Sequence, residues 1–177
     1  MMFATPEALA NFVEPWAKFH NHSKVAATVV TFLHVAPIVV GGGFGIFLDR
    51  ATLRLKHDDP YAGERHLLEL RAVHPYVTSA LALSIASGIA LLAADLDTFL
   101  GSWVFWLKMG LIVLLLTNGL FMTRLEKALQ RVSEEPASDV SALRATTLWD
   151  RLRLVAIFSL VLWLTITLAG VTLVNVS

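Results

Sequence analysis

Four long apolar runs, separated by shorter polar stretches, dominate the pattern of this chain. They cover residues 25–48, 72–94, 99–122 and 154–174. Each run is long enough to cross a hydrocarbon core of about 30 Å at about 1.5 Å per residue of helix. A helix satisfies its own backbone hydrogen bonds in lipid, so each run predicts a transmembrane helix. We therefore expect an all-α protein in which residues 1–177 form one membrane domain, an integral membrane four-helix bundle.

The segments outside these runs predict two shorter helices. In residues 1–23, Thr5 is a candidate cap, and an apolar face follows on an otherwise polar stretch, made by Leu9, Phe12, Val13, Trp16 and Phe19. This pattern is typical of an N-terminal interfacial helix, which we expect on the outer membrane surface. Residues 57–73, "HDDPYAGERHLLELRAV", predict a turn and a short amphipathic helix that leads into the second span.

Composition and charge support a membrane protein and indicate its orientation. The apolar fraction is 56% and the charged fraction 16%, against about 45–50% and 25% in soluble domains. The net charge of zero gives no sign of a nucleic-acid partner, and the lack of cysteine excludes disulfides. Eleven basic residues lie in or next to the loops that follow the first and third runs. The opposite side has only Lys18, Lys24 and Lys108. The positive-inside rule therefore predicts both termini outside. We expect the membrane to be a bacterial inner membrane.

Two ionisable residues lie within the apolar runs. His34 shares one helical face with Gly41 and Gly45, and this smooth face can admit either another helix or the flat edge of a cofactor. Lys108 lies at a similar predicted depth, where ionisable groups are costly and are candidates for function, although its long stem can also carry the charge to the surface. In the second run, Ser84, Ser87 and Gly88 predict close helix packing.

The other histidines lie near the ends of the runs. His74 is about 15–20 Å from His34 in depth, so we do not expect both to bind one iron. His20 and His22, two residues apart at the outer edge, could bind copper or zinc. For His57 and His66 we expect solvated or helix-capping roles.

Three stretches together resemble a known family. "FLHVAPIVVGGGFGIFLDRATLRLKH" resembles the first span of the bacterial four-helix, haem-containing protoporphyrinogen oxidase family. "ERHLLELRAVHPYVTSALALSIASGIALL" is similar to its second span, and "FWLKMGLIVLLLTNG" to its third. The copper-resistance D membrane proteins are similar at a looser level. The first resemblance implies haem b as cofactor, His34 as the ligand of the haem iron, and Lys108 and Arg50 as functional residues of an oxidoreductase.

Three hypotheses of function remain open at this point. The first is a b-type haem-binding membrane redox protein acting on a tetrapyrrole, in which Gly41 and Gly45 make room for the macrocycle. The second is a non-enzymatic accessory subunit of a larger respiratory or photosynthetic membrane complex. The third is a copper-handling membrane protein that uses His20 and His22 with His34.

Overall fold

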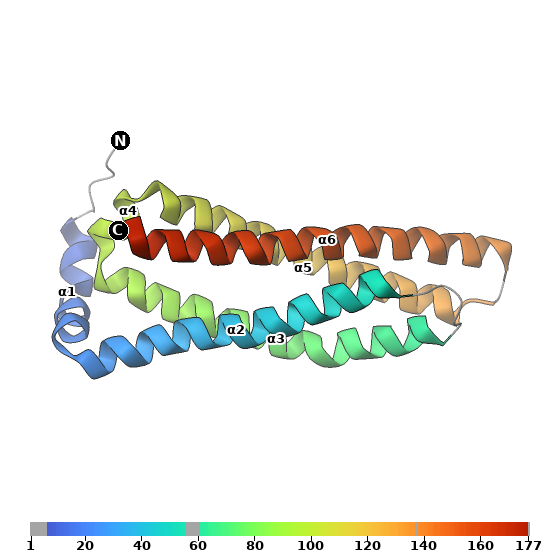
Figure 1. Cartoon of the computed structure of the whole chain (residues 1–177), viewed down its shortest axis with the longest axis horizontal. Coiled ribbons are helices and arrows are strands. Elements are labelled where there is room, and N and C mark those ends of the chain that lie inside the picture. Colours follow the sequence, from blue (N-terminus) through green and yellow to red (C-terminus); the bar gives the residue numbers. More distant parts are fainter. Residues whose placement is uncertain (1–6, 56–60, 137, 177) are drawn as a thin grey trace. The chain divides into compact units, whose positions relative to one another are not determined.

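The described part of the chain is almost entirely helical. The computed structural model describes residues 7–55, 61–136 and 138–176, and in these ranges it contains no strand (Figure 1). The helices are α1 (Glu7–His22), α2 (Lys24–Arg54), α3 (Ala62–Ala94), α4 (Leu96–Gly101), α5 (Trp103–Glu134) and α6 (Asp139–Val176). The predicted all-α class is confirmed. The candidate cap Thr5 and His57 lie outside the described residues.

In the described part of the chain, four helices are long and apolar enough to cross a membrane. They are Lys24–Arg54, Ala62–Ala94, Trp103–Glu134 and Asp139–Leu173. Large apolar side chains remain exposed along them, for example Phe32 at 65%, Val39 at 66% and Leu164 at 66%. Side chains of this kind on a spanning helix contact lipid, so the fold is that of a multi-pass membrane protein.

Two predicted boundaries differ from the structure. The short helix predicted within residues 57–73 is not separate, because α3 runs without interruption from Ala62 to Ala94. Leu67 and Leu70 on its first turns are buried, so tertiary packing continues the helix beyond the apolar run. The third predicted span begins too early, because residues 99–101 belong to α4 and the extended backbone of Ser102 separates them from α5.

The long helices contribute to two compact units, which we describe separately. The first comprises residues 1–43, 76–110 and 167–177. Its apolar core contains Val104, Phe105 and Leu173. The second comprises residues 44–75 and 111–166. Here α2, α3, α5 and α6 meet around one buried cluster, formed by Leu48, Leu67, Leu70, Met122, Leu129, Leu152 and Ala156.

Helix α1 is anchored to the end of α3 within the first unit. The indole Nε1 of Trp16 donates a hydrogen bond to the carbonyl of Ala90 at 2.8 Å. Phe12 and Phe19 remain 82% and 58% exposed. On the polar side, the Lys18 ammonium lies 2.7 Å from Glu14, and its hydrogen bond lowers the pKa of that carboxyl. The helix predicted here is confirmed, and its place on the outer membrane surface stays a prediction.

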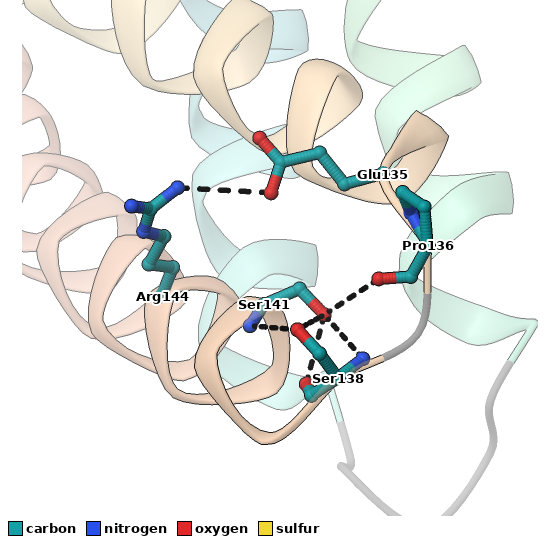
Figure 2. A network of polar contacts seen from close by, with 5 residues as sticks. All are labelled: Glu135, Pro136, Ser138, Ser141 and Arg144. Atoms are coloured by element: carbon teal, nitrogen blue, oxygen red, sulfur yellow. Dashed lines mark hydrogen bonds and ion pairs between the residues drawn. The ribbon is translucent and has the colours of Figure 1, made fainter.

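The connection between α5 and α6 is held by a reciprocal pair of serines in the second unit (Figure 2). The Oγ of Ser138 accepts a hydrogen bond from the backbone N–H of Ser141 at 3.1 Å, and the Oγ of Ser141 accepts one from the N–H of Ser138 at 2.9 Å. This is the geometry of a capping box, which satisfies backbone donors at a helix start. Arg144 also lies 3.7 Å from Glu135 across the turn. The start of α6 is therefore fixed by local sequence.

The orientation of the chain can be tested with single cysteines, since the sequence contains none. Lys24→Cys and Ser133→Cys replace exposed residues that make none of the capping contacts above. We expect an impermeant thiol reagent to label position 24 in intact cells and position 133 only after lysis, because the arginine-rich loops stay inside. Labelling of position 133 but not 24 in intact cells would reverse the topology.

Candidate functional site

His34 is the centre of a polar cluster between α2 and α3 in the first unit. Its Nδ1 lies 2.9 Å from the carbonyl oxygen of Ser84. The hydroxyl of Ser84 donates back to the carbonyl of His34 at 3.2 Å, and that of Ser87 donates to the carbonyl of Leu33 at 3.1 Å. A Cβ built on Gly88 would lie only 3.0 Å from Cε1 of His34. The imidazole is thus seated against α3 and held by backbone groups, and Ser84, Ser87 and Gly88 have the packing role predicted for them.

These contacts determine which nitrogen of His34 is available. A carbonyl oxygen only accepts hydrogen bonds, so the contact with Ser84 assigns the proton of the neutral imidazole to Nδ1. The lone pair is then on Nε2, which forms no hydrogen bond within the residues that the structure describes. Histidines that bind metals usually donate the other ring N–H to a carbonyl or carboxylate, which fixes the ring. His34 is therefore arranged as a ligand or as a proton acceptor.

Lys108 belongs to the same unit as His34. Its Nζ lies 3.7 Å from the position of a Cβ built on Gly170, so the side chain reaches from α5 to the small residue on α6. Lys108 is close enough to His34 for their charges to interact. It forms no ion pair with any residue of the described ranges. The first unit therefore contains both an imidazole and an ammonium group within its apolar helices.

The two glycines predicted to share the His34 face contact protein in the structure. A Cβ on Gly41 would lie 2.6 Å from Cβ of Ala80, so α2 and α3 approach closely at this point in the first unit. A Cβ on Gly45 would lie 3.0 Å from Nε1 of Trp163 in the second unit. The sequence left two occupants open for this face, another helix or the edge of a cofactor. In the structure, protein side chains lie against both glycines. The space that the haem hypothesis assigns to these two glycines stays a prediction.

The other candidate residues lie apart from this cluster. Arg50 is exposed and belongs to the second unit. In α1, Nδ1 of His22 bonds the carbonyl of Lys18 at 2.8 Å, and Nδ1 of His20 contacts Asn21 at 3.1 Å. No group of three or more histidine, aspartate or glutamate side chains able to hold a metal ion occurs within residues 7–55, 61–136 and 138–176. The copper hypothesis thus has no third ligand in the described chain.

The second unit contains buried polar residues that the sequence did not lead us to expect. Asp49, Thr52, His66 and Glu126 are all less than 7% exposed. Nε2 of His66 lies 2.7 Å from the hydroxyl of Thr52, and Asp49 is hydrogen-bonded to Ser159. One carboxylate oxygen each of Asp49 and Glu126 has no hydrogen-bond partner among the described residues. His66 is therefore neither solvated nor a helix cap, because it ties α3 to α2.

His74 also bonds within the second unit, where its Nε2 lies 3.2 Å from the hydroxyl of Thr123 on α5. The prediction that His74 and His34 do not share an iron stays a prediction.

Comparison with known proteins adds no assignment to this geometry. No protein family, no curated protein and no solved structure matches the chain. The functional argument therefore depends on the side chains of the site. These are the imidazole of His34, whose Nε2 is available, and the ammonium group of Lys108 in the same unit.

Proposed function

We propose that this chain is a b-type haem-binding integral membrane redox protein, with His34 as the axial ligand of the iron. The observation that supports the proposal most directly is the bond from Nδ1 of His34 to the carbonyl of Ser84, which leaves Nε2 available. Neutral imidazole is a common axial ligand of haem iron. The donor therefore fits the cofactor that the sequence resemblance implies.

The surrounding residues have distinct parts in this proposal. Ser84 and Ser87 fix the ring orientation through α3, as outer-shell groups do in many metal sites. Lys108 supplies a positive charge for a carboxylate, either a haem propionate or a carboxylate of the substrate. When bound, the haem supplies one-electron chemistry at its iron, and a tetrapyrrole is the proposed substrate class. Protein side chains lie against Gly41 and Gly45, and the role predicted for these glycines beside the macrocycle stays a prediction.

The proposal is tested by the absorption spectrum and haem content of protein purified gently from native membranes. We expect the wild-type protein to be coloured, with a reduced-minus-oxidised spectrum of b type. His34→Ala should remove the haem or shift its spectrum, because the anchored ligand is lost. His74→Ala is the matched control and should retain the spectrum, since that imidazole bonds Thr123 in the other unit.

A second pair of variants separates loss of the ligand from loss of the fold. Ser87→Ala removes a hydroxyl 3.4 Å from Nδ1 of His34 and should shift the spectrum with the haem still bound. Lys108→Met should retain the haem spectrum but weaken haem retention, because a charge that faces a carboxylate is lost. Colourless wild-type protein would reject haem binding and leave an accessory subunit as the better hypothesis. An unchanged spectrum in His34→Ala would show that the ligand is another residue.

A further inference from the structure

Asp49, near the end of α2, is a buried acid that the proposed haem function does not use. It is 2% exposed and follows directly after the first apolar run. Its carboxyl group is hydrogen-bonded to Ser159 of α6, whereas its Oδ2 atom has no hydrogen-bond partner among the described residues. An ionised carboxylate removed from water without a partner is far more costly than the neutral acid. The position therefore favours a carboxyl group that carries a proton.

The charged groups of the second unit do not offset a negative charge on Asp49. This residue forms no ion pair within the described ranges. Arg50, the next residue, is exposed, and Arg153 on α6 donates to a backbone carbonyl at 2.8 Å. On α5, Glu126 is a second buried acid, and Lys127 beside it is exposed. Glu126 thus adds negative charge to the same unit and cannot neutralise Asp49.

A proton fits this position better than a metal ion does. Metal ions are usually held by several protein donors. The described part of the chain contains no group of three or more histidine, aspartate or glutamate side chains able to hold one. A proton needs only the one carboxylate oxygen that has no partner, and its binding removes the uncompensated charge.

Polar side chains lead from Asp49 toward water. Thr52 is fully buried three residues after Asp49, so the two are neighbours on one face of α2, with about 5–6 Å between their Cβ atoms. The Thr52 hydroxyl lies 2.7 Å from Nε2 of His66 on α3, which is 4% exposed. Nδ1 of the same ring lies 3.8 Å from Glu69, whose side chain is 62% exposed. His66 therefore lies between a buried hydroxyl and an exposed acid.

The hydrogen bonds of Thr52 orient His66 for proton uptake. The Thr52 hydroxyl donates to the carbonyl of Leu48 at 3.0 Å and therefore accepts from Nε2 of His66. The lone pair of the neutral imidazole is then on Nδ1, on the side of Glu69. A proton from water can bind Nδ1, and the Nε2 proton can pass to Thr52 as the hydroxyl gives its own proton to Asp49. One proton thus reaches the carboxylate, and the imidazole ends neutral with its proton on Nδ1.

We propose that Asp49 is a proton-binding site of the membrane domain, which exchanges its proton with the aqueous phase through His66. Buried acids and histidines within membrane domains are typical of proton relays, and histidine changes its charge between about pH 5 and pH 8. The aqueous phase in question is the one on the side of the arginine-rich loops, because the end of α2 and the start of α3 flank the first of these loops. The site is independent of the proposed haem function, since all its residues belong to the second unit.

Infrared spectroscopy of the protein in lipid nanodiscs would measure the protonation of Asp49, because a protonated carboxyl group has a C=O band that a carboxylate lacks. We expect this band at neutral pH. Aspartate with an isotope-labelled carboxyl carbon should shift the band of Asp49 and leave any band of Glu126 unchanged, so the assignment needs no variant. Asp49→Asn should remove the shifted band. Asp150→Asn is the matched control and should retain it, because Asp150 is exposed on α6.

The part played by His66 is tested by the rate at which the Asp49 band shifts after transfer into heavy water. His66→Gln retains an N–H donor for Thr52 but cannot take up a proton. The shift should slow at least about tenfold, since a positioned proton carrier contributes about 10²-fold or more to a rate. The band at equilibrium should stay that of the wild type, which separates a proton carrier from a residue that only shapes the core. His74→Gln should exchange like the wild type, because His74 bonds Thr123 on α5.

Two results would overturn the site itself. The first is wild-type protein without an isotope-shifted acid band at neutral pH, and the second is such a band that survives Asp49→Asn. Exchange in His66→Gln as fast as in the wild type would overturn the route through His66. None of these readouts depends on haem, so colourless protein that shows the Asp49 band would reject the haem proposal alone.

Discussion

Gly41→Leu is expected to destabilise the first unit by about 3 kcal/mol or more, which is at the upper end for overpacking of a core. A Cβ at this position would lie 2.6 Å from Cβ of Ala80, closer than carbon atoms approach in proteins. Cβ of Ala80 is attached directly to the backbone and cannot rotate away, so α2 and α3 would have to separate. His34 bonds Ser84 across these same two helices. The variant should therefore also lose any ligand that His34 binds.

Gly43→Leu is the matched control for this substitution. No atom of the described residues lies within 4 Å of a Cβ at Gly43, and the residue is exposed. Leucine there should be neutral or stabilising by up to about 1 kcal/mol, because leucine is a better helix former than glycine. Thermal unfolding in detergent, followed by circular dichroism and by yield of monodisperse protein, would measure both variants. Equal behaviour of the two would show that α2 and α3 do not meet at Gly41.

Leu152→Ala should lower the free energy of unfolding of the second unit by about 2–5 kcal/mol. Leu152 is 0% exposed and belongs to the cluster in which all four long helices meet. Alanine would leave a cavity at that junction, and the well-packed neighbours can fill it only in part. Unfolding in a mixed-micelle titration would give the free energy change.

Leu154 provides the comparison on the same helix, since it is 67% exposed. Leu154→Ala removes the same atoms from a surface that faces lipid, so we expect a change well below that of Leu152→Ala. If the two alanine variants unfold at the same denaturant fraction, the cluster is not the core of this unit.

The four spans could be predicted because hydropathy adds up over about twenty residues and gives a strong signal. The helix ends were less predictable, since Leu67 and Leu129 extend buried faces into segments rich in charge. His34 and Lys108 were found from the cost of ionisable groups in lipid. Which carbonyl would orient His34 could not be read from the sequence, because it depends on how α2 is paired with α3.

The buried acids of the second unit were missed for a related reason. Asp49 directly precedes Arg50, and Glu126 directly precedes Lys127, so the sequence alone places both acids in solvated charged loops. A weak signal was present, since Glu126 lies four residues after Met122 and three before Leu129, on one helical face. If the helical periodicity of the third apolar run is extended beyond its end, Glu126 falls on the buried side of the helix.

The serine-capped turn between α5 and α6 has a consequence for biosynthesis. Only residues 135–138 separate the two helices, so α6 emerges from the ribosome directly behind α5. Asn118 on α5 donates its side-chain N–H to the carbonyl of Val155 on α6 at 3.2 Å, within the second unit. Moving a side-chain amide into hydrocarbon without a hydrogen-bond partner costs free energy. Here the partner of Asn118, the carbonyl of Val155, lies on the next helix of the same helical hairpin. The two helices are thus suited to enter the bilayer together, as a single insertion unit that already satisfies its own polar group.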